Sequence, residues 1–315
     1  MFRISAIAAC TAIVLISGQT ALSQNATPAG TEDQPFTLNV PVNEVNVMFH
    51  VSDSKGVPLE HVKREDLQLF DNAKRQNRLV AFHEYTDLPI RVGFLLDNSP
   101  SMQPELDRSK AIATELINDF FRANSDRAFT MGFGVDSRLT RDWTQDADAV
   151  SAGIGEASAQ SDEHDGTAIF DAIYTACRDK FTAEASARSG NFILLFTDGE
   201  ENSSHIWESE AVDMCQRART AIYVFTSGWK TRASRGQEII EDLVAKTGGR
   251  VFFEKKESVH DALAATVSDM RYQYELVYAP AGLKRDGSFH EIKLRCAVPH
   301  SQIQARSGYY ANAKR

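Results

Sequence analysis

The sequence contains few cysteines and prolines, and beyond its N-terminus it has no long apolar run. Its 315 residues include 4 Cys and 9 Pro, which excludes a disulfide-rich scaffold and a collagen-like or largely disordered chain. No two cysteines form the CxxC pair of a zinc or redox site; they are Cys10, Cys177, Cys215 and Cys296.

Positive charge is also in deficit. The chain carries 34 Lys and Arg against 43 Asp and Glu, a net charge of −9, and no segment forms a local basic patch. An acidic chain repels phosphate backbones, so we do not expect nucleic acid as a partner. With 43% apolar and 24% charged residues, the composition is that of a globular protein, and the length suggests about two domains, each with a core of its own.

The first 23 residues predict a secretory signal peptide. A positive charge at Arg3 precedes an apolar run from Ile4 to Ile16, and Ala21-Leu22-Ser23 supplies a small-x-small cleavage site. A run of about 13 apolar residues is too short to span a bilayer. We therefore expect cleavage near Ser23, a secreted or periplasmic protein, and no membrane span.

Residues 24–35 are polar and rich in turn-forming residues, which predicts a flexible leader. Residues 36–87 then alternate with period two, as expected for a small N-terminal antiparallel β unit. The parity of the alternation changes near Asn43-Glu44, which indicates a bulge or a break. A hairpin is predicted around Asp71-Asn72, its two arms carrying Leu67 and Leu69, and Leu79 and Ala81.

From residue 88 to residue 270 the pattern changes to short, solidly apolar strands that alternate with amphipathic helices. This is typical of a doubly wound, mostly parallel α/β sheet that helices cover on both faces. An additional edge strand is predicted at Arg138–Trp143. The main predicted strands are Ile90–Leu96, Ala128–Val135, Phe192–Thr197, Ala221–Thr226 and Arg250–Phe253.

Residues 271–315 return to period two. We expect this C-terminal β segment to pack with the N-terminal β unit, so that the α/β domain is inserted into a β-sandwich-like unit built from both ends of the chain.

Carboxylate and hydroxyl side chains follow the predicted strands. In an open parallel sheet, ligands bind beyond the carboxyl ends of the strands. Such oxygen donors suit Mg²⁺ or Mn²⁺ and suit Zn²⁺ poorly. The sequence therefore predicts a divalent metal site. Its residues come from D-x-S-x-S at 97–101, from the Asp165-Gly166-Thr167 loop and from Asp198-Gly199, and they are Asp97, Ser99, Ser101, Thr167 and Asp198.

Each part of this site also has a purely structural interpretation. Ser101 and Thr167 are good helix N-caps, and Asp198-Gly199 is a common strand-ending turn. Glu200 and Glu201 are expected to form a solvated acidic rim, and His205 is expected on the surface near a helix start.

The three loops resemble the metal-ion-dependent adhesion site (MIDAS) of the von Willebrand factor A (VWA) family. The resemblance spans about residues 88–270. It implies that Ser99, Ser101 and Thr167 contact the metal directly, that Asp97 and Asp198 act through water, and that a protein partner supplies a carboxylate to the open coordination position. Pro100 departs from the family, which often has Gly there.

The flanking segments resemble the acidobacterial VWFA-related subfamily in VPLEHVKREDLQLFDN, RDGSFHEIKLRC and ARSGYYA. The function implied is a non-enzymatic, secreted or periplasmic module of protein–protein interaction and cell adhesion, with a Mg²⁺-bridged carboxylate.

Two alternatives stay open. A metal-dependent, phosphohydrolase-like enzyme could use the same carboxylates. However, no general base and no Lys/Arg clamp for a phosphate can be recognised from its spacing to these residues. The second alternative is a structural envelope protein with a vestigial metal site. The G-x-S-x-G and H-E-x-x-H patterns are absent.

The resemblance also concerns the cysteines. Its strand order places the helices that carry Cys177 and Cys215 side by side, so a disulfide between them is one expectation and two separate core thiols are the other. Cys296 lies in an alternating strand and is expected to be buried and free.

Overall fold

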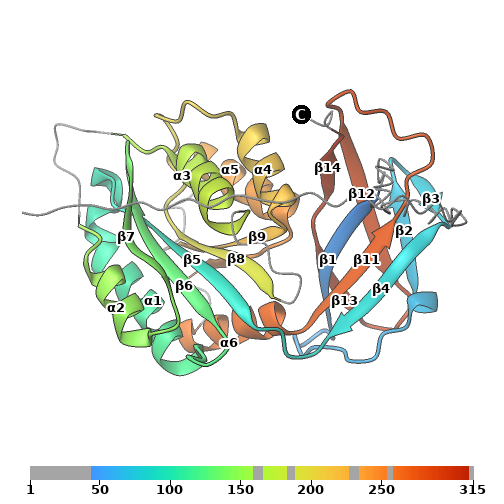
Figure 1. Ribbon diagram of the computed structural model, residues 1–315, viewed down its shortest axis with the longest axis horizontal. Helices are drawn as coiled ribbons and strands as arrows, with labels where there is room; N and C mark the ends of the chain where they lie inside the picture. The colour runs from blue at the N-terminus through green and yellow to red at the C-terminus, as the bar shows by residue number, and fades with distance from the viewer. Residues whose placement is uncertain (1–43, 159–165, 183–188, 227–233, 254–257, 312–315) are drawn as a thin grey trace, which may run out of the picture. The chain divides into compact units, whose positions relative to one another are not determined.

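The computed structural model describes residues 44–158, 166–182, 189–226, 234–253 and 258–311 (Figure 1). The predicted signal peptide, the leader and the break near Asn43 lie outside these residues and stay predictions. Within the described part of the chain, no helix has the length and apolar character needed to cross a membrane.

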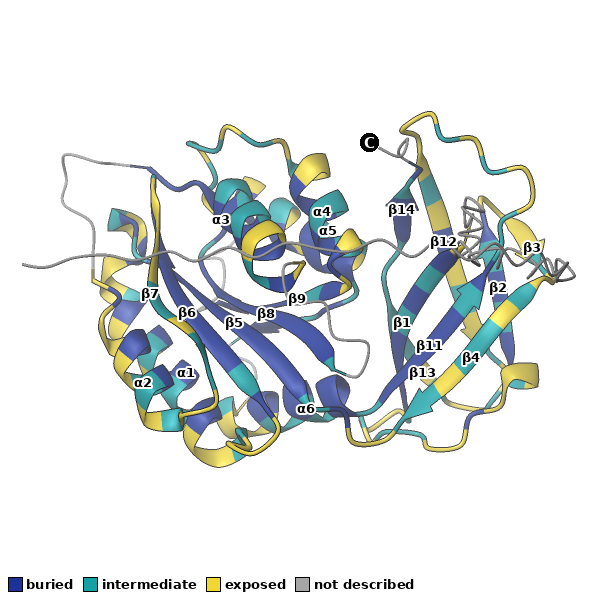
Figure 2. Ribbon diagram, viewed as in Figure 1, coloured by how far each residue is buried: buried dark blue, intermediate teal, exposed yellow. Residues whose placement is uncertain are grey.

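A six-stranded sheet with the order β10-β9-β8-β5-β6-β7 forms the centre of the α/β part. Five of its strands run parallel, and β7 joins the edge antiparallel to β6. The strands are β5 (Ile90–Asp97), β6 (Arg127–Phe133), β7 (Ser137–Thr144), β8 (Gly190–Phe196), β9 (Thr220–Thr226) and β10 (Val251–Phe253). Every residue of β5 and β8 is buried (Figure 2), because helices cover both faces of the sheet. The predicted doubly wound α/β fold is confirmed.

The helices form two layers, one on each face of the sheet (Figure 1). One layer holds α1 (Leu106–Phe120), α2 (Ala147–Gly155) and α6 (Val259–Arg271). The other holds α3 (Ile169–Thr175), which continues as a π-helical turn over Ala176–Phe181, together with α4 (Glu208–Arg217) and α5 (Arg235–Thr247).

Two four-stranded antiparallel sheets flank the α/β part, with the orders β13-β1-β11-β4 and β14-β12-β2-β3. Their strands come from both sides of the α/β part and share one apolar core, which fits the predicted β-sandwich-like unit. They are β1 (Val45–Ser52), β2 (Leu67–Asp71), β3 (Lys74–Gln76), β4 (Leu79–Tyr85), β11 (Gln273–Tyr278), β12 (Phe289–Cys296), β13 (Gln302–Ala305) and β14 (Gly308–Tyr310).

The predicted hairpin partner is wrong. Strand β2 turns back at once into β3, because Asn72 and Ala73 both adopt left-handed backbone conformations, with φ of 46° and 62°. Two such residues close a tight two-residue turn. Leu79 and Ala81 instead lie on β4, which pairs with β11 in the other sheet.

Cys177 and Cys215 form a disulfide, with their Cα atoms 5.1 Å apart. Cys177 lies in the π-helical turn after α3 and Cys215 lies in α4, and both side chains are fully buried. Cys296 is free, as predicted, but it is half-buried rather than buried. It is the last residue of β12, in which Ile292 is the buried residue.

A buried ion pair between Asp126 and Arg271 lies where the chain enters the α/β part, at β5, and leaves it, after α6. Arg271 donates to both carboxylate oxygens of Asp126, at 3.2 and 2.6 Å, and to the carbonyls of Leu88 and Phe120. Asp126 also accepts the backbone N–H of Ile90 at 3.0 Å. The pair is thus almost fully hydrogen-bonded, which is the condition under which a buried ion pair is tolerated.

We expect Asp126→Ala to lower the free energy of unfolding by about 3–5 kcal/mol, because it leaves the Arg271 guanidinium buried and uncompensated. The matched control is Asp87→Ala. Its ion pair with Arg122 is exposed (side-chain exposure 65% and 51%), so its loss should cost less than about 1 kcal/mol. Urea denaturation measures both, and equal costs would contradict the central place of the buried pair.

The disulfide predicts the thiol count. The chain from residue 24 onward, denatured without reductant, should show one reactive thiol, that of Cys296. Titration with a thiol reagent reads this directly. Three reactive thiols would show that Cys177 and Cys215 are not bridged.

Candidate metal centre

The three predicted site loops lie at the same edge of the central sheet. Strands β5 and β8 are parallel neighbours, with Leu96 beside Phe196, so Asp97, which ends β5, and Asp198, which follows β8, lie at adjacent strand ends. The third loop is tied to the end of β6, because Ala168 N–H donates to the Gly134 carbonyl at 2.7 Å. The carboxyl ends of parallel strands thus bring distant segments of the sequence together, as expected for an open α/β sheet.

Asp97 is the buried acid of the site, with 1% of its surface exposed. One carboxylate oxygen accepts the Ser99 N–H at 3.0 Å, and the other accepts the Thr197 hydroxyl at 2.6 Å. Burial raises the pKa of Asp97 to about 6; the hydrogen bonds from Ser99 and Thr197 oppose this rise, and the charge of Asp198 adds to it. The carboxylate therefore has neutral donors and a second acid around it, and a bound cation would stabilise its charged form.

Thr197 is a site residue that the sequence prediction missed. Its hydroxyl donates to Asp97 and accepts the N–H of Gly199 at 3.0 Å, so one side chain joins two loops. The available signal was a hydroxyl residue directly before Asp198, at the last position of the apolar strand predicted at Phe192–Thr197.

Ser99 and Ser101 bring their hydroxyl oxygens within 3.2 Å of each other. Ser99 is buried and Ser101 is exposed. The alternative that Ser101 is a helix N-cap is wrong, because a 3-10 turn spans Pro100–Glu105 and α1 begins only at Leu106. Pro100 occupies the first position of that turn, where its fixed φ is well suited.

Thr167 is buried, and its backbone is bound by the loop after β8. Its N–H donates to Asn202 Oδ1 at 2.9 Å, and its carbonyl accepts the N–H groups of Asn202 and Ser203, both at 3.1 Å. The preceding Gly166 has no room for a side chain, since a Cβ there would lie 2.1 Å from Ser203 Oγ. The N-cap alternative for Thr167 is also wrong, because Ala168 occupies that position of α3.

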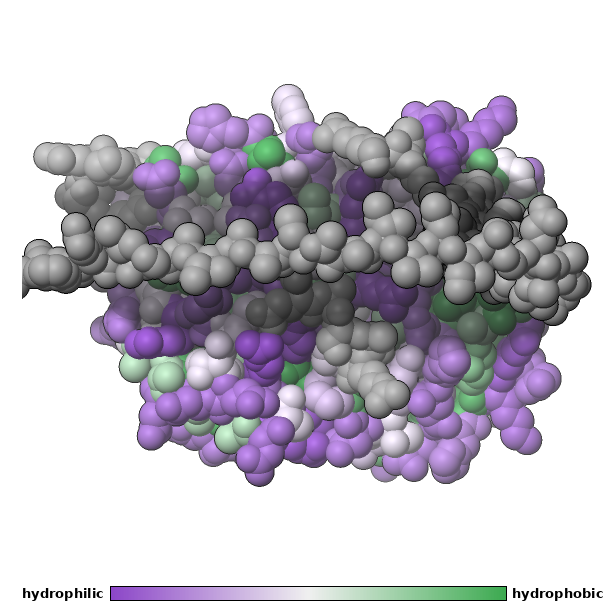
Figure 3. All heavy atoms as spheres, viewed as in Figure 1, coloured by the Kyte–Doolittle hydropathy of each residue, from purple (hydrophilic) through white to green (hydrophobic). Residues whose placement is uncertain are grey.

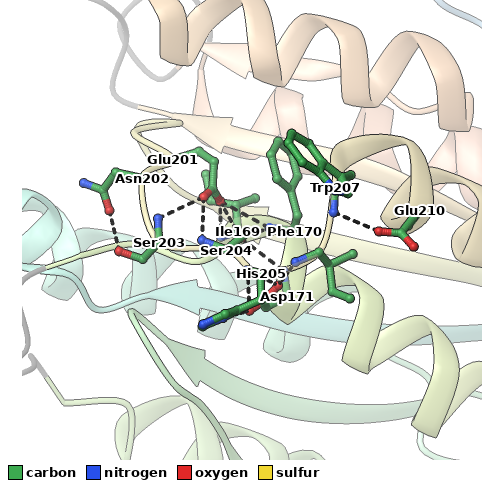
Figure 4. A network of polar contacts seen from close by, with 11 residues as sticks. Ile169, Phe170, Asp171, Glu201, Asn202, Ser203, Ser204, His205, Trp207 and Glu210 are labelled. Carbon is green, nitrogen blue, oxygen red and sulfur yellow. Dashed lines mark hydrogen bonds and ion pairs between the residues drawn. The ribbon is translucent and has the colours of Figure 1, made fainter.

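Glu201 is not the solvated rim residue that the sequence predicts. Figure 4 shows its carboxylate between the start of α3 and the loop that precedes α4. It accepts the N–H groups of Ile169 at 2.6 Å and Phe170 at 3.3 Å, and those of Ser203 at 3.1 Å and Ser204 at 2.9 Å. A carboxylate in this position satisfies N–H groups at the helix start and interacts favourably with the helix dipole.

Asp171 fixes the next part of the same loop. Its carboxylate accepts the N–H groups of His205 at 3.0 Å and Ile206 at 2.7 Å, and it lies 3.1 Å from His205 Nδ1. Burial raises the pKa of Asp171, but these hydrogen bonds outweigh burial and lower it. The His205 side chain is 88% exposed, in agreement with the predicted surface position, although α4 begins three residues later, at Glu208.

A second group of side chains of the kind that can ligate a metal lies on the surface of α1 and α6. His260 Nδ1 is 3.5 Å from a Glu115 carboxylate oxygen and 3.8 Å from one of Asp119. These residues form ordinary exposed ion pairs, and they are separate from the loops described above.

The von Willebrand factor type A domain model matches residues 92–265, which is more than half of the chain. The chain belongs to the VWA family. VWA domains are in general non-enzymatic modules of protein interaction, and the five predicted site residues lie on loops of this VWA domain.

Several solved structures are similar to this VWA chain. An aerotolerance-related membrane protein from Bacteroides fragilis NCTC 9343, with multiple mutations to serine, is 19% identical over 57% of this chain and 98% of its own, with a TM-score of 0.45. BatB from Bacteroides thetaiotaomicron is 19% identical over 57% and 96%, with a TM-score of 0.44.

Proximal thread matrix protein 1 from the mussel byssus, with a zinc-occupied MIDAS motif, is 13% identical over 63% of this chain and 49% of its own, with a TM-score of 0.48. No curated protein sequence matches the chain.

Glu201→Ala removes the acceptor of four backbone N–H groups. We expect it to lower the free energy of unfolding by about 1–3 kcal/mol, because buried donors lose their partner. The neighbouring Glu200 is exposed, so Glu200→Ala should change stability by less than about 0.5 kcal/mol. Chemical denaturation compares the two, and similar small effects would show that the Glu201 network does not stabilise the loop.

Proposed function

We propose that the chain is a secreted or periplasmic VWA binding module. It holds Mg²⁺ or Mn²⁺ at Asp97, Ser99, Ser101, Thr167 and Asp198, and it binds a protein partner through a carboxylate that the partner supplies. The observation that carries this proposal is the buried Asp97 carboxylate, which has neutral hydrogen-bond donors around it and a second acid, Asp198, close enough to raise its pKa.

The donor set fits a hard cation. All five side chains offer oxygen, and none offers the nitrogen or sulfur that Zn²⁺ prefers. By resemblance to the family, the hydroxyls of Ser99, Ser101 and Thr167 would touch the metal, and Asp97 and Asp198 would hold its water ligands. The metal would supply a positive charge at the carboxyl edge of the sheet.

A carboxylate partner follows from the charge of these ligands. Hydroxyl groups are neutral, so the ion keeps much of its positive charge toward an external anion. Ser101 is exposed and Asp198 is half-buried, so the site is accessible from solvent on this side. Where Figure 3 shows described side chains, they are mostly hydrophilic, so the visible part of this face does not offer a broad apolar docking surface.

The hydrolase alternative has less support. Metal-dependent phosphoryl transfer needs a positioned base or a cationic clamp beside the metal. The imidazole nearest in sequence to these loops, that of His205, points its Nδ1 at the Asp171 carboxylate. A vestigial site is disfavoured because all five oxygen side chains are present.

Two finer proposals concern the chain as a whole. Its flanking segments support membership of the acidobacterial VWFA-related subfamily, and residues 1–23 support export with cleavage near Ser23. Mass spectrometry of the N-terminus of the exported protein tests the cleavage site.

Asp97→Ala should weaken Mg²⁺ or Mn²⁺ binding by about 10–100-fold, the usual effect of removing a group that orients metal ligands. Isothermal titration calorimetry of the metal-stripped protein measures this. His260→Ala, which removes the imidazole of the exposed group on α1 and α6, is the matched control and should bind metal as the wild type does. Unchanged binding in Asp97→Ala would contradict the site.

A partner captured from envelope extract should be released by a chelator and should return when Mg²⁺ is restored. At a Mg²⁺ concentration that just saturates the wild type, the Asp97→Ala variant should capture much less of it, whereas His260→Ala should capture as much as the wild type. A partner that binds equally with and without chelator would contradict recognition through a metal-bridged carboxylate.

A further inference from the structure

A cavity of about 70 Å³ lies at the edge of the central sheet opposite the metal centre. The amino ends of β8 and β9 form one wall, with Ser189 and Thr220 among the lining residues. Strands β1 and β11 of one flanking sheet form another, with Asn46 and Gln273, and Arg306, in the link from β13 to β14, also lines the cavity. Residues of both the VWA domain and its flanking unit therefore line the cavity.

Arg306 brings a poorly compensated charge to this cavity. Its Nη2 donates to the Asn46 carbonyl at 2.5 Å, and its guanidinium lies 6.0 Å from the Tyr309 ring centre. Its Nε is buried and has no hydrogen-bond partner among the residues that the structure describes. Burial lowers the pKa of Arg306 to about 10, so the side chain is still a cation at neutral pH.

The acid of the cavity is already engaged elsewhere. Glu275 accepts hydrogen bonds from the Asn46 amide, from the Tyr85 hydroxyl at 2.8 Å and from Arg219 at 3.3 Å. Glu275 thus compensates the positive charge of Arg219, and the positive charge of Arg306 has no carboxylate paired with it among the described residues. A second buried polar atom on the cavity wall, Ser189 Oγ, also has no partner in the described part of the chain.

A buried donor without a partner costs about 1–3 kcal/mol, and more when it is charged. An anion in the cavity would compensate the charge of Arg306, since guanidinium and carboxylate form strong charge-assisted hydrogen bonds. A single water molecule occupies roughly 10–15 Å³ of such cavity volume, so the cavity has room for roughly five to seven non-hydrogen atoms. Met48, Leu88 and Phe192 add apolar side chains to the wall, which suits a short hydrocarbon chain.

We propose that this cavity binds a small organic monocarboxylic acid, with the carboxylate on the Arg306 guanidinium at the wall that Ser189 also lines, and with the short apolar chain between the VWA domain and the flanking sheets. The ligand would bridge the two parts of the chain at the sheet edge opposite the metal centre. The site is independent of the proposed metal-dependent function.

The test uses the full chain, stripped of divalent metal and carrying Asp97→Ala, so that no carboxylate can bind through the metal centre. Sodium propionate is titrated by calorimetry and in thermal unfolding, with sodium chloride and propionamide as the probes that lack either the apolar chain or the charge. Propionate should give a saturable heat and raise the Tm, and chloride and propionamide should not. Equal responses to all three, or no response to propionate, would overturn the proposal.

Two variants test whether propionate binds at this cavity. Arg306→Met should weaken propionate binding by at least about tenfold, while the Tm without ligand stays close to that of the parent, because a poorly paired, half-buried charge is replaced by an apolar chain. Arg295→Met is the matched control, since Arg295 also lies over a ring, that of Phe70 at 5.2 Å, but on an exposed strand position.

Ser189→Leu provides the independent check if Arg306→Met does not fold. Leucine would fill the cavity from a position whose hydroxyl has no hydrogen bond to lose. Loss of the propionate response in this variant supports the site. Propionate binding that persists in both Arg306→Met and Ser189→Leu would overturn it.

Discussion

The ion pair between Asp126 and Arg271 is the interaction on which the arrangement of this chain depends. Arg271 ends α6, and Asp126 binds the N–H of Ile90, the first residue of β5. The pair therefore fixes the two points at which the chain enters and leaves the VWA domain. It also fixes the beginning of the strand that ends at Asp97, so the orientation of the metal centre and the placement of β11 depend on the same contact.

The proposed metal centre depends on a second constraint, which is the attachment of one loop to another. Thr167 and the start of α3 are held by Asn202 and Glu201, which follow a different strand. Thr197 holds Asp97 in the same way. Backbone and side-chain hydrogen bonds thus position these loops without an ion, and the repulsion between the buried Asp97 and the half-buried Asp198 would favour the binding of a cation.

Sequence reasoning succeeded where burial on two faces imposes a pattern. The solidly apolar strands gave the doubly wound sheet, and the polar residues directly after them gave the residues that the fold gathers at one edge. Sequence reasoning failed where contacts between distant segments determine strand pairing or the role of a side chain. The partner of β2 depended on left-handed turn residues at Asn72 and Ala73. The role of Glu201 depended on its contact with the start of α3, more than 30 residues away, in addition to its local bonds with Ser203 and Ser204. The half-exposure of Cys296 followed from its position at a strand end.

The most direct test of the account is a crystal structure with Mn²⁺, in which anomalous scattering locates the ion without reference to any activity. The account predicts a peak at about 2 Å from the hydroxyl oxygens of Ser99, Ser101 and Thr167. A peak only at Glu115, Asp119 and His260, or no peak beside those hydroxyls at saturating Mn²⁺, would contradict it.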